Sequence, residues 1–156
     1  MMHMAGADMV IERFTAEHLK QIVPQAAQLC DWPDSAERDA RGMVFAAQQH
    51  CWTFLDHAGG IVACFGMVAS HAQHLTAWAV MSDMGQVRLG YVTRWCRAYL
   101  DDTDVRRIDV IVRAGFSNGH QWARLLGFEP EGVQRAFFAD GEDMHVYARI
   151  RAEENT

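Results

Sequence analysis

Thr76-Ala-Trp-Ala-Val-Met81-Ser-Asp-Met-Gly-Gln86 is the stretch that decides the fold of this chain. It reads as a strand and a glycine-containing turn, followed by the helical pattern Val87–Leu100 and a second strand, Arg107-Ile-Asp-Val-Ile-Val112. A strand, a crossover helix and a second strand pair in parallel with a right-handed connection. Ligands of open sheets bind in the crevice beyond the carboxyl ends of such strands. We therefore place the candidate functional site at the turn Ser82–Gly90.

The helix that begins at this turn offers unpaired backbone N–H groups and the positive end of its dipole. Both favour an anion such as a phosphate. Its core-facing stripe is predicted to consist of apolar residues at helical spacing: Val87, Tyr91, Val92, Trp95, Cys96, Tyr99 and Leu100.

Composition bounds the remaining possibilities. With 156 residues, half of them hydrophobic, the chain is predicted to be a single domain with a sizeable core. Its net charge of −6 argues against nucleic acid as a partner. The longest apolar run, Ile61–Ala69, is too short to cross a bilayer, and no secretory signal precedes it. The four cysteines lack C-x-x-C spacing and have apolar neighbours, which predicts buried free thiols and a cytoplasmic location.

The N-terminal half alternates between strands and helices. Residues 1–7 have no periodic pattern and are predicted to be a loose end, and Asp8–Phe14 is a strand. Thr15 and Ser35 are the predicted N-caps of two helices, and Pro24 should end or kink the first. Their predicted apolar faces are Leu19, Ile22, Val23, Ala26 and Leu29 in the first, and Ala36, Ala40, Met43, Val44 and Ala47 in the second. A hairpin of Cys51–Leu55 and Ile61–Ala69 follows.

The C-terminal part is predicted to be a short helix, Ser117–Leu126, and a final hairpin of Val133–Ala139 and Met144–Ile150. Gly127 fits the left-handed residue after a helix, and Phe128 should pack on the core. A polar tail, 151–156, ends the chain. The fold class is α/β with a mixed sheet flanked by helices, in the order βααβββαβαββ.

This order, together with Leu125-Leu-Gly-Phe-Glu-Pro-Glu-Gly132, resembles the GNAT superfamily of acetyl-CoA-dependent N-acetyltransferases. The octapeptide looks like the family's LGF-x-x-x-G, and the resemblance covers nearly the whole chain. It implies that the fourth and fifth strands part, that the pantetheine arm of acetyl-CoA binds the fourth strand, and that the pyrophosphate binds the turn after it. The implied activity is acyl transfer from acetyl-CoA to an amine that attacks the thioester directly.

The turn departs from the family pattern Gln/Arg-x-x-Gly-x-Gly/Ala. Gly90 matches its last small residue, but Arg88 replaces the middle glycine and Gly85 the first basic residue. Arg88 has three interpretations: an obstacle on the phosphate path, a cation for the phosphates, or a solvated helix residue. The resemblance implies cofactor contacts from the strand end, the turn and the last helix: Val80, Met81, Gly85, Gln86, Val87, Arg88, Leu89, Gly90, Tyr91 and Asn118.

The family's catalytic groups do not carry over. Ala123 stands where a tyrosine is frequent, and the strand Thr76–Met81 has no carboxylate. His120 and Asp83 are the candidate catalytic residues; their simpler interpretations are an exposed helix residue and a helix cap. Asp109 is either a buried acid of raised pKa or an edge residue facing Arg106 or Arg107. His71-x-x-His74 lacks further metal ligands in the sequence, so no metal site is predicted.

Two main functions remain open, and a CoA-binding regulatory module without turnover is a third possibility. The first is an N-acyltransferase with a degenerate pyrophosphate turn that uses acetyl-CoA and a small-molecule or peptide amine. The second is a catalytically inactive protein of the same fold, because Met81–Val133 also looks like a GNAT-like group encoded beside phage structural genes, some members of which are virion-associated. The partners would then be phage structural proteins, or a second copy in a homo-oligomer. The first function requires the strands beside residues 82–90 to part and to present unpaired amides.

Overall fold

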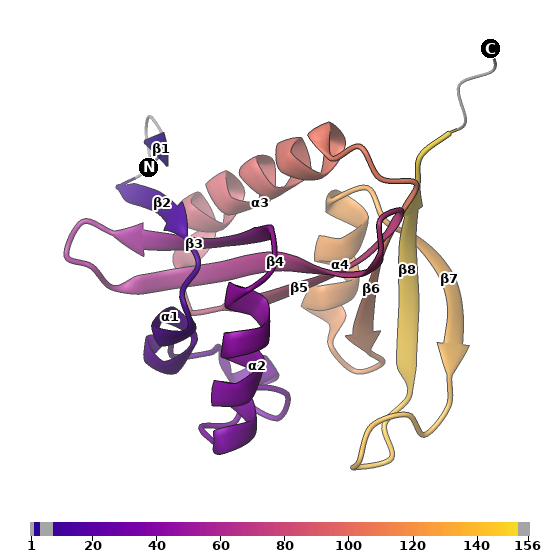
Figure 1. The fold of residues 1–156 in the computed structure, drawn as a ribbon. Coiled ribbons are helices and arrows are strands. Elements are labelled where there is room, and N and C mark those ends of the chain that lie inside the picture. Colours follow the sequence, from indigo (N-terminus) through magenta and orange to yellow (C-terminus); the bar gives the residue numbers. More distant parts are fainter. Residues whose placement is uncertain (1, 4–7, 153–156) are drawn as a thin grey trace. The chain divides into compact units, whose positions relative to one another are not determined.

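The computed structural model describes residues 2–3 and 8–152. Within these residues, eight strands form one sheet in the order β1-β2-β3-β4-β5-β6-β8-β7, and Figure 1 labels them. The strands are β1 (Met2–His3), β2 (Met9–Arg13), β3 (His50–Asp56), β4 (Ile61–His71), β5 (His74–Met81), β6 (Arg107–Arg113), β7 (Glu129–Gln134) and β8 (Met144–Ile150). The helices are α1 (Ala16–Gln21), the 3-10 turn η1 (Ala26–Gln28), α2 (Ala36–Ala46), α3 (Gly85–Asp102) and α4 (Ser117–Leu125).

The predicted order βααβββαβαββ is confirmed, with β1 and η1 as additions. The sheet is mixed: β5 and β6 pair in parallel through residues 74–76 and 107–109, whereas β2–β3, β3–β4 and β6–β8 are antiparallel. The chain divides into two compact units. The first consists of Met1–Val68 and Trp78–Arg94, and the second of Ala69–Ala77 and Trp95–Thr156. The prediction of a single domain stays a prediction.

In the first unit, α1 begins and ends at the predicted signals. The Thr15 hydroxyl accepts a hydrogen bond from the His18 amide, and the His18 ring accepts one from the Thr15 amide. Ile22 leaves the helical conformation two residues before Pro24, as expected from the clash of a proline with the preceding helical turn. The predicted apolar face is wrong beyond this point, because Val23 and Leu29 are exposed.

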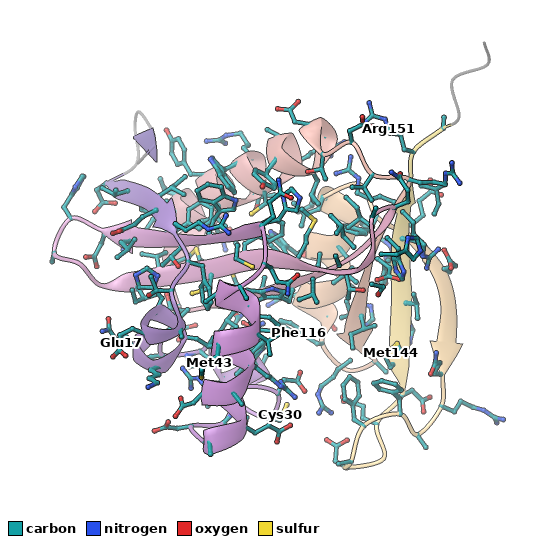
Figure 2. The ribbon with its side chains drawn as sticks, viewed as in Figure 1. Glu17, Cys30, Met43, Phe116, Met144 and Arg151 are labelled. Carbon is teal, nitrogen blue, oxygen red and sulfur yellow. The ribbon has the colours of Figure 1, made fainter. Side chains whose placement is uncertain are left out.

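The predicted apolar face of α2 is also wrong. Met43, which Figure 2 labels on α2, is 71% exposed, whereas Arg38 is buried. The Arg38 guanidinium donates to the carbonyl oxygens of Leu19 (2.9 Å), Ile22 (2.7 Å) and Trp32 (3.2 Å). Carbonyls at the end of α1 lack intrahelical partners, and a buried cation satisfies several of them at once. The polar side chain therefore faces inward, and the apolar Met43 faces out.

The predicted hairpin β3–β4 is confirmed. The Asp56 carboxylate accepts hydrogen bonds from the amides of Ala58 (2.9 Å) and Gly60 (2.8 Å), which closes the turn. A core cluster lies beneath these strands and includes Phe14, Leu19, Ile22, Trp32, Cys51, Cys64 and Val80. Cys51, Cys64 and Cys96 are buried free thiols as predicted, but Cys30 is exposed.

In the second unit, α4 ends as predicted. Gly127 has φ +89°, and Phe128 is buried. The last hairpin is partly wrong: β8 is as predicted, but its partner β7 covers Glu129–Gln134 rather than Val133–Ala139. All six β7 residues are exposed, so this edge strand carries no apolar alternation that the sequence could reveal.

The termini lie largely outside the described residues. Of the predicted loose end 1–7, only β1 is described, and it pairs with β2, so the prediction is wrong for these two residues. Of the predicted tail 151–156, the described Arg151 and Ala152 are in neither helix nor strand. None of the described helices combines the length and apolarity needed to cross a bilayer.

Candidate functional site

The turn from β5 into α3 lies in the first unit. α3 begins at Gly85, two residues before the predicted start, and runs for 18 residues. Gly85 has φ +78°, and no atom lies within 4 Å of the position that a Cβ would occupy there. The first turn of α3 contains no acidic residue. This helix start is therefore open and electrically suited to an anion.

Most residues that the family resemblance implies as cofactor contacts run from the end of β5 into the first turns of α3. Val80 and Met81 are buried, Gly85, Gln86 and Val87 are exposed, and Arg88, Leu89, Gly90 and Tyr91 are half-buried. Val87 was predicted to be a core residue of α3, but it is 71% exposed. Val92, Cys96 and Leu100 do form the predicted core stripe. Asn118 is exposed and belongs to α4 in the second unit.

Arg88 forms an ion pair with Asp8, the residue before β2. Its Nε donates to Asp8 Oδ1 at 3.0 Å and its Nη2 to Oδ2 at 2.6 Å. The bidentate hydrogen bonds to Arg88 lower the pKa of Asp8 and raise that of Arg88. A carboxylate thus occupies the fork that a phosphate would use. The Asp8 side chain is 63% exposed, so an anionic ligand would compete with a partner that water already screens.

The end of β5 has a second internal partner, which the sequence did not suggest. The Gln28 side chain accepts from the Met81 amide (2.8 Å) and donates to the Ala79 carbonyl (2.9 Å). The Gln25 amide donates to the Met81 carbonyl (2.7 Å). The Gln28 carboxamide therefore contacts β5 as one peptide unit of a neighbouring strand would. The Met81 amide, which an acyl-CoA would need, is not unpaired.

Of the two candidate catalytic residues, Asp83 lies in the first unit. It is exposed and lies two residues before α3. Its neighbour Ser82 is tied to β4, since both its amide and its hydroxyl donate to the Val62 carbonyl, at 3.0 and 2.7 Å. Asp83 is thus held beside the turn by a fixed backbone.

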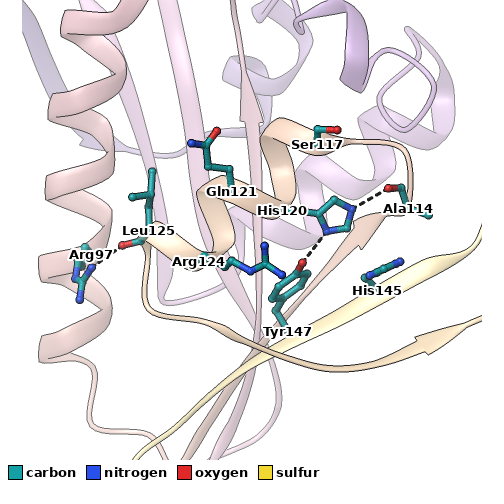
Figure 3. Close-up of a pocket in the computed structure, with 9 residues that line it drawn as sticks. All are labelled: Arg97, Ala114, Ser117, His120, Gln121, Arg124, Leu125, His145 and Tyr147. Atoms are coloured by element: carbon teal, nitrogen blue, oxygen red, sulfur yellow. Dashed lines mark hydrogen bonds between the residues drawn. The ribbon is translucent and has the colours of Figure 1, made fainter.

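His120 lies in the second unit, on the first turn of α4. Its Nε2 lies 2.9 Å from the Ala114 carbonyl and must donate to it, so Nδ1, 2.7 Å from the Tyr147 hydroxyl, accepts from that hydroxyl in the neutral ring. Both nitrogens are therefore engaged (Figure 3). The predicted exposed histidine is a half-buried residue that joins α4 to β8.

A pocket of about 650 Å³ surrounds His120. Figure 3 shows its lining: Arg97, Ala114, Ser117, His120, Gln121, Arg124, Leu125, His145 and Tyr147. Arg97 donates to the Leu125 carbonyl at the end of α4 (2.7 Å), and Arg124 lies over the Tyr147 ring. Both arginines are placed where the negative end of the helix dipole favours a cation, which accounts for them without a ligand.

Asp109 on β6 contacts Arg107 as predicted (Nε to Oδ2, 3.3 Å), but the predicted edge position is wrong, because β6 pairs with β5 on one side and β8 on the other. Its side chain is only 15% exposed. Burial would raise its pKa, but hydrogen bonds from Thr76 and His74 and the charges of His74 and Arg107 outweigh it, so the pKa is lowered. The predicted raised pKa is wrong. Within the described residues no cluster of three or more metal-ligating side chains occurs.

Comparison with solved structures finds the same fold among acetyltransferases. Ard1 from Thermoplasma volcanium matches with a TM-score of 0.72 at 12% identity, over 94% of this chain and 100% of that chain. An acetyltransferase of the GNAT family from Bacillus anthracis matches with a TM-score of 0.66 at 13% identity, over 92% and 95%. A GNAT superfamily phosphinothricin acetyltransferase from Sinorhizobium meliloti, in complex with AcCoA, matches with a TM-score of 0.63 at 17% identity, over 92% and 89%.

These likenesses show the fold, and the predicted GNAT-like fold is confirmed. No protein-family model and no curated protein matches the sequence. At such low identity the activity of these neighbours does not pass to this chain, so its function must be argued from its own residues.

Proposed function

We propose that the protein binds an acyl-CoA at the turn from β5 into α3 and transfers the acyl group to an amine. The observation that carries the proposal is the open start of α3 at Gly85, with its left-handed φ and its free space. Only a residue without a Cβ adopts this conformation at no cost, and the backbone amides that follow it can approach phosphate oxygens closely. The GNAT-like fold, one neighbour of which is a complex with AcCoA, supports the same ligand.

Two further residues fit an anionic ligand of this kind. Arg88 supplies a guanidinium in the first turn of α3, and its present partner Asp8 is largely exposed. Of the three interpretations of Arg88, this proposal takes the one in which it supplies a cation to the phosphates, because a guanidinium fork that binds a carboxylate also fits phosphate oxygens. The Met81 amide is a donor suited to an amide or thioester carbonyl once Gln28 has moved.

The chemistry requires no covalent enzyme intermediate. The amine lone pair attacks the thioester carbonyl carbon, the C–S bond breaks, and the electron pair leaves with sulfur as the CoA thiolate. The proton lost by nitrogen neutralises the thiolate directly or through water. Asp83, exposed beside the turn, and His120 were the candidate proton carriers. His120 has both ring nitrogens engaged and suits this role less.

A second function, an inactive protein of the same fold, is favoured by the two internal contacts. Gln28 occupies the Met81 amide, and Asp8 occupies Arg88. A scaffold that had lost its ligand would be expected to fill these positions with its own side chains. Such a protein would act through an interaction surface rather than through acyl transfer.

Thermal melting with acetyl-CoA separates the two functions. About 1 mM acetyl-CoA should raise Tm by several degrees if Kd is about 10 μM, because a ligand at 100 times Kd stabilises by about 2.7 kcal/mol. Free thiol released in the presence of an amine panel would then establish transfer. An unchanged Tm would leave the inactive scaffold. A shift without thiol release would indicate a CoA-binding module.

A further inference from the structure

We propose that residues 23–31, the strap, close the acyl-CoA site of the free protein and leave β5 when the ligand binds. The proposal rests on the proposed function, because it concerns access to the same site. The strap contains η1 and lies in the connection between α1 and α2. The strap, the end of β5 and the turn into α3 all belong to the first unit, so the contacts among them are made within one compact body.

The two ends of the strap are fixed by one buried side chain. The Arg38 guanidinium donates to the carbonyl oxygens of Ile22 (2.7 Å) and Trp32 (3.2 Å), the residues directly before and after the strap. Ile22 and Trp32 also belong to the core cluster. Hydrogen bonds from a charged donor are stronger than neutral ones, and Arg38 is only 5% exposed, so water screens them little. The ends therefore stay in place whatever the middle of the strap does.

The middle of the strap is held at β5 by two glutamines. The Gln28 carboxamide accepts from the Met81 amide (2.8 Å) and donates to the Ala79 carbonyl (2.9 Å). The Gln25 amide donates to the Met81 carbonyl (2.7 Å), and the Gln25 side chain donates to Gln28 Oε1 (3.1 Å), which orients the carboxamide. Both polar backbone groups of Met81 are therefore occupied by the strap, and a ligand reaches the Met81 amide only after this contact has broken.

Apolar packing contributes little to the closed position of the strap. Within the strap only Pro24 and Gln28 are buried, whereas Val23 is 75% and Leu29 is 50% exposed. The hydrophobic effect stabilises the closed position in proportion to the apolar area removed from water, and that area is small here. A segment with few buried apolar contacts opens locally at a fraction of the free energy of global unfolding. The strap therefore suits a segment that moves between two fixed ends.

An acyl-CoA carries amide groups of the same kind as the Gln28 carboxamide. One partner of the Met81 amide is therefore exchanged for another, and the released carboxamide forms hydrogen bonds with water instead. Because the ligand binds only the open position of the strap, it shifts the population toward that position. The apparent Kd of the wild type equals the Kd of a permanently open protein divided by the open fraction. The strap is thus an autoinhibitory segment that acyl-CoA displaces.

Displacement of the strap has a signature in hydrogen exchange that ordinary ligand binding lacks. A ligand slows the exchange of the amides that it covers, whereas a released strap exchanges faster. The Gln25 amide loses its Met81 acceptor, and the turn in which the Asp31 amide donates to the Gln28 carbonyl (3.1 Å) loses its support at β5. Exchange in the strap should therefore rise on ligand binding while exchange at the start of α3 falls, and these opposite signs separate a displaced strap from one that merely lines the site.

The test is hydrogen–deuterium exchange of the full chain with and without saturating acetyl-CoA, measured in peptides that cover the strap, α2 and residues 85–90. We expect exchange in the strap to rise by about tenfold or more, exchange of residues 85–90 to fall, and exchange in α2 to stay within about twofold. Gln28→Ala should show the fast exchange of the strap without ligand. Gln21→Ala changes an exposed glutamine of α1 outside the strap and is the matched control, which should behave as the wild type.

A nitroxide label on Cys30 provides a second measurement. Cys30, labelled in Figure 2, is an exposed thiol of the strap, and the other three cysteines are buried, so the reagent modifies Cys30 selectively. Acetyl-CoA should sharpen the electron paramagnetic resonance spectrum of this label as the strap is released. A label at Met43→Cys in a Cys30→Ser chain lies on the exposed face of α2, and its spectrum should not change.

The outcomes separate the inference from the proposed function. If acetyl-CoA raises Tm while exchange in the strap falls or stays constant, the inference is wrong and the proposed function stands. If acetyl-CoA changes neither Tm nor exchange, the proposed function falls, and the inference with it.

Discussion

Replacing Gln28 with alanine tests whether its carboxamide stands in for a ligand. The wild-type side chain closes the end of β5 with two hydrogen bonds, to the Met81 amide and the Ala79 carbonyl, and it is 9% exposed. The variant leaves the buried Met81 N–H and the half-buried Ala79 C=O without these partners. Each unsatisfied group of this kind costs about 1–3 kcal/mol, and water entering the vacated space recovers part of it. We expect a net loss of about 1–3 kcal/mol, or a fall in Tm of about 2–12 °C.

The same change should strengthen acetyl-CoA binding. In the wild type a ligand amide must displace Gln28 before it reaches the Met81 amide, whereas in the variant this step is absent. If displacing Gln28 costs about 1–3 kcal/mol, its removal tightens the Kd for acetyl-CoA by about 5–150-fold. Calorimetric titration of both proteins with acetyl-CoA measures the two Kd values. Gln25→Ala is the control, because its side chain contacts Gln28 but not β5, and its backbone bond to Met81 persists.

The reasoning is refuted if Gln28→Ala lowers Tm as expected but binds acetyl-CoA with unchanged or weaker affinity. Gln28 would then be a brace between the η1 segment and β5, and the Met81 amide would have no role toward a ligand.

Three further predictions concern charge and thiol chemistry. Asp8→Asn releases Arg88 from its ion pair and should tighten acetyl-CoA binding, more so at low salt, whereas Arg88→Gly should weaken that binding. Calorimetric titration with acetyl-CoA at two salt concentrations measures both effects. Tighter binding by Arg88→Gly would mean that Arg88 obstructs the phosphates. Folding lowers the pKa of Asp109, so this carboxylate stabilises the fold above its unfolded pKa, and the stabilisation is lost as pH falls through its folded pKa. Asp109→Asn should therefore flatten the pH dependence of the free energy of urea unfolding below about pH 4. An unaltered pH dependence would contradict the contacts of Asp109 with His74, Thr76 and Arg107. Cys30 is exposed and should react at once with a thiol reagent in the native protein. Cys51, Cys64 and Cys96 should react only on unfolding, since burial shields them and raises their pKa values. Four fast-reacting thiols in the native protein would contradict the burial of these three cysteines.

The sequence predicted the elements well where one local signal controls them. Thr15 and Ser35 cap α1 and α2, and Gly127 ends α4 with a positive φ, because caps and left-handed residues depend on neighbours in the chain. The faces of α1 and α2 were less predictable. Their burial depends on Arg38, a charged residue that folds inward to satisfy distant carbonyls, and such a role leaves no periodic pattern.

The candidate site was predictable only in part. The glycine turn at Gly85 could be found from sequence because its conformation is a property of one residue type. The side chains that contact this turn and the strand before it could not be found from sequence. Gln28 lies 53 residues from Met81, and Asp8 lies 80 residues from Arg88. His74 and Asp109 were each noticed, but their meeting depends on the parallel register of β5 and β6. That register follows from tertiary pairing, which single-residue patterns do not encode.

The most direct measurement of the central claim is an amide-resolved NMR titration of the ¹⁵N-labelled protein with acetyl-CoA. If the start of α3 holds the pyrophosphate, the backbone amides of residues 85–90 should shift in a saturable way, and dephospho-CoA should produce the same shifts. The Met81 amide should move with them as Gln28 is displaced. Unchanged amides at 85–90 under millimolar acetyl-CoA, or shifts confined to other segments, would contradict an acyl-CoA site at this turn.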